Sequence, residues 1–97
     1  MELNDYSAHF LTALLRAFPE FGDLFVPGPE PGCFTLQFLN SAGAAVVVFI
    51  EEGERITICF DDSHVHFGGW FNSIDDVDFA NAIDFIRTLK NSKPGHS

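Results

Sequence analysis

Basic residues are scarce in this sequence. Its 97 residues include five lysines and arginines against fourteen aspartates and glutamates, which gives a formal net charge of −9. Only two of the bases, Arg16 and Arg55, lie within residues 1–86, which hold all of the acids. Such a chain repels phosphate groups, so we expect no binding to nucleic acid. It would instead attract a basic partner and raise the rate of association.

Long apolar runs are also missing. The longest, Ala44–Ile50, has the length of a strand, well short of the roughly 20 residues that cross a bilayer. Residues 1–5 lack the positive and apolar regions of a signal peptide. We therefore expect a cytoplasmic protein that does not enter a membrane.

Cysteine is rare, and familiar catalytic motifs are absent. Cys33 and Cys59 lie on different predicted strands and outside any CxxC pair, so in a reducing cytosol we expect free thiols. The sequence contains no GxSxG, P-loop or GxGxxG motif. Ser63 and His64 are neighbours, whereas the members of a catalytic triad converge from separate elements. The sequence therefore predicts a protein that is not an enzyme and has no cofactor.

Apolar residues, by contrast, are plentiful. They make up 46% of the chain and include twelve phenylalanines. Since each large aromatic side chain buries about 150–250 Å², these residues suffice for one compact core. We expect a single domain over residues 1–97, with an ordered core over about 4–91 and a tail over 92–97.

Periodic patterns predict the order of the elements. Apolar residues at helical spacing indicate a helix over about residues 5–18 and another that begins after Ser73. Alternating residues and short glycine-containing turns indicate hairpins between these helices. The predicted strands cover about 33–39, 44–51, 55–61 and 64–71. The predicted fold class is α+β: an N-terminal helix, an antiparallel meander of about four strands and a C-terminal helix, with the helices packed on the sheet.

One stretch combines a strand pattern with polar residues. From residue 56 to residue 67, alternating apolar residues give way to aspartates and histidines. If the strand runs straight through, one face carries every second side chain. That face would hold Ile56, Ile58, Phe60, Asp62, His64 and His66. Alternatively, a separate strand begins at about residue 64, after Asp61–Ser63.

Two of these residues suggest a ligand site. His64 and His66 form an HxH pair, and on a strand their imidazoles project to the same side. Zinc needs three or four ligands, however, and Asp62 is the third ligand that local spacing offers. A metal- or small-ligand-binding domain that uses Asp62, His64 and His66 is therefore an alternative hypothesis, while our preferred interpretation places no metal here.

The preferred interpretation is a protein-binding face. Interface hot spots favour tryptophan within a polar rim, and Trp70 follows the acids and histidines of this stretch. The acids would steer a basic partner, and the histidines and the tryptophan would pack against it. The predicted partner-binding residues are Glu51, Glu52, Glu54, Asp61, Asp62, His64, His66 and Trp70.

The run from Phe60 to Phe67 has the form F-D-x-x-H-x-H-F. It resembles a strand motif of small bacterial immunity-type proteins, which are encoded beside the polymorphic toxins that bacteria deliver to competitors. The resemblance covers about residues 34–71, and the chain departs from the motif at Ser63, where an aromatic residue is frequent. The resemblance implies a non-enzymatic inhibitor that binds and neutralises one cognate toxin. The acidic character of the chain favours a basic toxin such as a nuclease, because acidic residues can mimic the phosphates that a nuclease binds.

A secretion chaperone or adaptor is a further alternative. A module of that kind would bind a secreted client protein. The apolar strand at residues 44–50 is compatible with either a monomer or a homodimer.

Overall fold

The computed structural model describes residues 2–28, 30–51, 54–69 and 74–91. The elements follow one another along the chain as α1 (Asp5–Ala17), the 3-10 helix η1 (Pro19–Asp23), β1 (Phe25–Pro27), β2 (Phe34–Leu39), β3 (Ala45–Glu51), β4 (Arg55–Phe60), β5 (Ser63–Gly68) and α2 (Asp75–Lys90). The predicted α+β class is therefore confirmed. The predicted tail over 92–97 lies outside the described residues.

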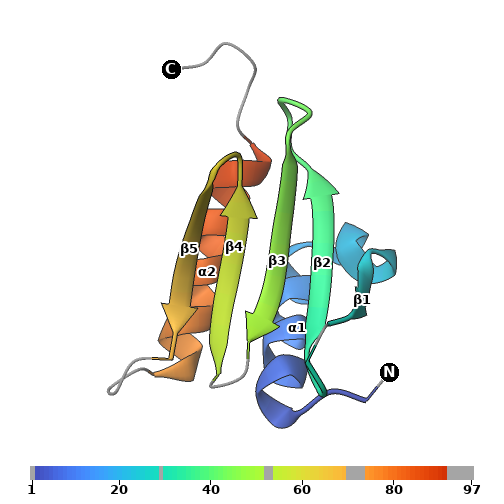
Figure 1. The fold of residues 1–97 in the computed structure, drawn as a ribbon, viewed down its shortest axis with the longest axis vertical. Helices are drawn as coiled ribbons and strands as arrows, with labels where there is room; N and C mark the ends of the chain where they lie inside the picture. Colours follow the sequence, from blue (N-terminus) through green and yellow to red (C-terminus); the bar gives the residue numbers. More distant parts are fainter. Residues whose placement is uncertain (1, 29, 52–53, 70–73, 92–97) are drawn as a thin grey trace.

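The sheet is an antiparallel meander in the order β1-β2-β3-β4-β5 (Figure 1). It has five strands where the sequence predicted about four. The additional strand, β1, is three residues long and ends at Pro27. Three residues are too few to display an alternating pattern, and proline has no N–H to give to a ladder, so this segment reads as a connection in the sequence.

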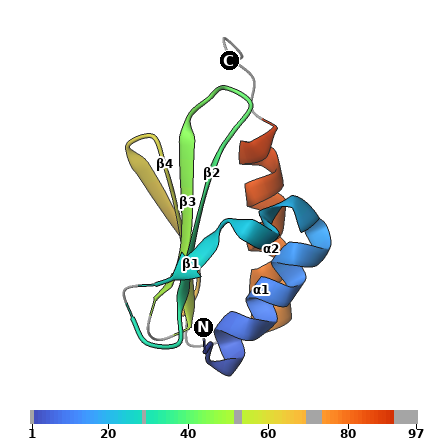
Figure 2. The same ribbon diagram turned by 90° about the vertical axis from the view of Figure 1, so that its right-hand side faces the viewer.

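Both helices cover the same face of the sheet (Figure 2). Asn4 begins α1, because its side-chain Oδ1 accepts a hydrogen bond from the Ser7 amide at 2.8 Å. Phe10 of α1 then packs between Phe34 of β2 and Phe79 of α2, with ring centroids 6.2 and 5.3 Å apart. We call this covered side of the sheet the inner face and the opposite side the outer face.

The register of the strands places apolar and polar side chains on opposite faces. One inner row runs across the sheet through Leu36, Val48, Ile58 and Val65, the first three of which are fully buried. The adjacent outer row consists of Thr35, Phe49, Thr57 and His66. Strand side chains alternate, so the core lies wholly between the inner face and the two helices.

The straight strand considered over residues 56–67 is not what forms. Asp61 and Asp62 make a two-residue loop between the paired residues Phe60 and Ser63, so the chain reverses direction and starts β5. The reversal puts Ile58 on the inner face and His64 on the outer face. The Asp61 backbone adopts a positive φ of 50° in this loop, as hairpin loops of two residues require.

Two further expectations can be compared with the structure. Cys33 and Cys59 are both free thiols, as predicted. Within the described residues, no helix combines the length and the apolar character that crossing a bilayer demands.

Candidate functional site

The outer face of the sheet is not covered by any described helix (Figure 2), so its side chains are open to a partner. Apolar side chains remain partly accessible there. Val47 and Phe49 of β3 and Cys59 of β4 are half-buried, whereas Leu39 is 67% exposed and Val26 is 53% exposed. Solvent-accessible apolar groups that are contiguous on one face are typical of surfaces that bind a partner.

The predicted acidic residues do not form one cluster. Asp61 and Asp62 are exposed in the β4–β5 loop, at one end of β4. Glu51 and Glu54 lie at the other end, where Glu51 ends β3 and pairs with Arg55. Six residues of β4 separate the two groups, a length of about 20 Å at the usual rise of a strand. Glu52 and Trp70 lie outside the described residues.

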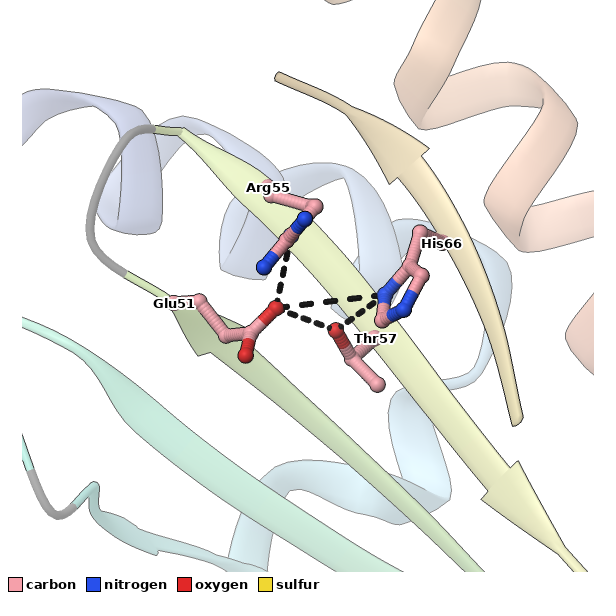
Figure 3. Close-up of polar contacts among 4 residues, drawn as sticks. All are labelled: Glu51, Arg55, Thr57 and His66. Atoms are coloured by element: carbon pink, nitrogen blue, oxygen red, sulfur yellow. Dashed lines mark hydrogen bonds and ion pairs between the residues drawn. The ribbon is translucent and has the colours of Figure 1, made fainter. Parts of the chain in front are cut away.

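His66 belongs to a polar network at the Glu51 end of the outer face (Figure 3). Glu51 Oε2 accepts hydrogen bonds from Arg55 Nε and Thr57 Oγ1, both at 2.7 Å. The Thr57 hydroxyl also lies 2.8 Å from His66 Nδ1, and that nitrogen is 3.9 Å from Glu51 Oε2. The four residues come from three neighbouring strands, and Thr57 is only 2% exposed at the centre.

The number of protons in this network fixes the state of the imidazole. An ionised carboxylate accepts hydrogen bonds only, so the single hydroxyl proton of Thr57 goes to Glu51. The Thr57 oxygen must then accept a proton from His66 Nδ1. A neutral His66 is therefore the Nδ1–H tautomer, in which Nε2 is the basic nitrogen.

The charge on Glu51 is stabilised by the same contacts. The hydrogen bond from Thr57 is the largest cause that lowers the pKa of Glu51 from its ordinary value of 4.5. The hydrogen bond and the positive charge of Arg55, and the charge of His66, lower it further. The Glu51 side chain is 28% exposed and that of Arg55 is 45% exposed, so solvent weakens the ion pair between them. The network thus keeps a carboxylate ionised and an imidazole oriented at the surface.

The two histidines are neighbours on the outer face. Their ring centroids are 5.1 Å apart with the planes at 60°. The reversal at Asp61–Asp62 leaves Asp62 in the loop, however. Among the described residues, no three histidine, cysteine, aspartate or glutamate side chains are placed to hold a metal ion.

A small cavity lies beside His66. It has a volume of about 80 Å³ and is lined by Arg55, His66, Gly68 and Gly69. One large cation and one imidazole in its wall could contact a small polar ligand. A hydroxyl nucleophile activated by His66 would have to reach Nε2, whereas the Thr57 hydroxyl is bound at Nδ1.

Arg55 and Thr57 were not recognised as site residues in the sequence. Glu51 and Arg55 flank the predicted β-turn, so an ion pair across a hairpin could have been foreseen. The contact between Thr57 and His66 depends on the register of β4 with β5, which follows only once the loop is known to be Asp61–Asp62.

Comparisons with known proteins yielded no match: no family model, curated protein or solved structure matches the chain. The resemblance to immunity-type proteins therefore stays a prediction.

Proposed function

We propose that this protein is a non-enzymatic inhibitor of the immunity type, which acts in the bacterial cytoplasm and neutralises one cognate basic toxin by binding it. The outer face of the sheet, with acidic loops at its ends, is the proposed contact surface. The observation that carries the proposal is that a sheet of five strands has both described α-helices on one side and partly accessible apolar residues on the other (Figure 2).

The apolar part of the outer face would contribute favourable free energy to the binding of a protein. Val47, Phe49 and Leu39 retain accessible surface, and burying apolar surface contributes about 25 cal/mol per Å² before the costs of association. The surrounding Thr35, Gln37 and His64 supply hydrogen-bonding groups. Such a mixture of apolar centre and polar rim is usual for a specific interface.

The charge of the chain supplies the choice of partner. Its net charge is −9, and exposed Asp61, Asp62 and Glu54 lie at the two ends of the outer face. A field of this sign speeds the approach of a basic protein and disfavours an acidic one. Rapid capture is what an antidote needs, because its target damages the cell from the moment it is folded.

The test has two parts. Tagged protein is first used to capture partners from its own organism at low and moderate salt, and the bound protein is identified by mass spectrometry. The captured protein is then expressed alone and together with this chain. The proposal predicts one dominant basic partner that is toxic alone and harmless when co-expressed. A partner that is secreted and harmless would instead identify a chaperone or adaptor, and the absence of any partner would contradict the proposal.

The cavity beside His66 favours one alternative, a small-ligand-binding domain. Its volume of about 80 Å³ admits only a few heavy atoms, and Arg55 and His66 line it. Titration with zinc and with small anions, followed by thermal unfolding, tests this alternative directly. Stabilisation that His66→Ala removes would support a ligand site, and unchanged stability would leave the protein-binding proposal as the better account.

A further inference from the structure

The two edges of the sheet differ in how they are protected. Edge strands expose unpaired main-chain groups, and proteins usually blunt them with short length, proline, lysine or bulges. At one edge, β1 has three residues and ends in Pro27. At the other edge, β5 has six residues, Ser63–Gly68, without proline, lysine or a bulge in its pairing with β4 (Figure 1). Among the residues that the structure describes, none of these devices protects β5.

The register shows which groups β5 presents outward. Phe60 and Ser63 close a two-residue loop, and such a closing pair is hydrogen-bonded in an antiparallel hairpin. Hydrogen-bonded and non-hydrogen-bonded pairs then alternate along the hairpin, so Val65 directs its main-chain groups towards β4. The N–H and C=O groups of His64 and His66 consequently point to the open edge.

The two ends of β5 differ in charge, and the middle of the strand carries no carboxylate. The exposed Asp61 and Asp62 precede the strand. At the far end, Gly68 pairs with Arg55 of β4, and the nearby Asp78 Oδ2 is buried. The acidic end of this edge is therefore the Asp61–Asp62 loop.

This charge distribution decides between two possible occupants. A second copy would carry the same net charge of −9, so the two molecules would repel each other. An extended segment with basic residues beside the Asp61–Asp62 loop would instead be attracted to that loop.

We propose that the edge of β5 binds an extended segment of the basic partner as a sixth strand of the sheet. Main-chain hydrogen bonds at His64 and His66 hold the segment, as in other complexes formed by strand addition. Side chains of the segment contact the two imidazoles, and its basic residues lie against Asp61–Asp62. The inference rests on the proposed function, since it states how the basic partner is held.

The first test separates main chain from side chain at one position. His64→Pro removes an outward N–H without removing a donor to β4, whereas His64→Ala removes the imidazole and keeps the N–H. We expect His64→Pro to weaken binding of the captured partner about tenfold or more beyond the effect of His64→Ala, since one lost hydrogen bond and the blocked approach of a strand both act. His64→Ala loses only the contact of the imidazole. Equal binding by wild type and His64→Pro would overturn the proposal.

A second measurement does not depend on the proline variant folding. Amide hydrogen exchange of the wild-type protein, read residue by residue by NMR, should slow at His64 and His66 when the partner binds, because these amides become hydrogen-bonded. Binding without this protection would contradict strand addition while leaving the proposed inhibitor intact. A wild-type protein that captures no partner would count against the proposed function itself.

Discussion

The Nδ1 atom of His66 lies 2.8 Å from the hydroxyl oxygen of Thr57, a residue that is only 2% exposed. Thr57 is committed as a donor to Glu51, so the contact also selects the tautomer of the imidazole. The buried Thr57 hydroxyl on β4 therefore connects the Glu51 carboxylate to the His66 imidazole on the edge strand β5. The connection can be broken with little change in shape, because valine closely resembles threonine in volume.

Replacing Thr57 by valine should release both ends of this connection. The pKa of Glu51 should rise towards 4.5, since the hydrogen bond from Thr57 is the largest cause of its lowering. His66 should lose its preference for the Nδ1–H tautomer. Carboxylate and imidazole signals followed by NMR across pH measure both effects. Thr35→Val, on the same outer face, is the control and should alter neither group.

Glu51 should make stability depend on pH in acid. Its pKa is lowered in the folded protein, so ionised Glu51 stabilises the fold above its unfolded value of about 4.5, and that contribution is lost as the pH falls through the lower folded value. We expect Glu51→Gln to cost about 1 kcal/mol near neutrality. Denaturant unfolding of both proteins should show this difference shrinking below about pH 4.5. A difference that stays constant down to about pH 3 would show that Glu51 does not act through its charge.

Gly68 and Gly43 form a matched pair for substitution by alanine. Both have positive φ, 84° and 80°, but a Cβ at Gly68 would lie 2.8 Å from Tyr6 Oη and from the Glu54 carbonyl, while a Cβ at Gly43 meets nothing within 4 Å. We expect Gly43→Ala to cost about 1 kcal/mol from backbone strain alone. Gly68→Ala should cost about 2 kcal/mol more, because Tyr6 Oη and the Glu54 carbonyl must both shift.

Equal losses for the two variants would show that Tyr6 and Glu54 move aside without cost. Thermal unfolding of both variants against wild type provides the comparison.

The β4–β5 loop also invites a stabilising change. Asp61 adopts φ 50° and Asp62 has no positive φ, so glycine relieves strain at the first position and only adds flexibility at the second. Asp61→Gly should therefore unfold at higher denaturant concentration than Asp62→Gly, by about 1 kcal/mol in the free energy of unfolding. The two variants remove the same charge, which cancels electrostatic effects. The reverse order of stability would contradict the assigned loop geometry.

Much of the fold can be predicted from sequence patterns that are long enough to identify a helix or a strand. The apolar stripe of α1 and the alternation in β2 extend over several repeats, and β3 is a continuous apolar run of strand length, so the type of each element can be predicted. β1 has no such pattern, because it is a strand only by virtue of its pairing with Phe34 to Leu36 of β2. Tertiary pairing, rather than local preference, creates that element.

In the candidate site, too, some features follow from the local sequence and others only from the pairing of strands. His64 and His66 stand out in the sequence by composition, but their neighbours depend on a reversal at two aspartates. A shift of one residue in that loop would have turned both histidines to the inner face. Thr57 could not be identified beforehand, because an isolated threonine in a strand is ordinary until the register places it between Glu51 and His66.

We expect the acidic loop beside β5 to recruit the basic partner. The decisive measurement is the dissociation constant of the captured partner for three proteins at low and moderate salt: wild type, Asp61→Lys with Asp62→Lys, and Asp23→Lys with Asp84→Lys. Each pair of substitutions replaces two negative charges by two positive ones and so changes the net charge from −9 to −5. All four aspartates are exposed. The loop variant should bind about tenfold or more weakly, with a smaller dependence on salt, while the control stays close to wild type. Equal weakening of both variants would reduce the effect to net charge, and unchanged binding by the loop variant would show that the loop does not recruit the partner.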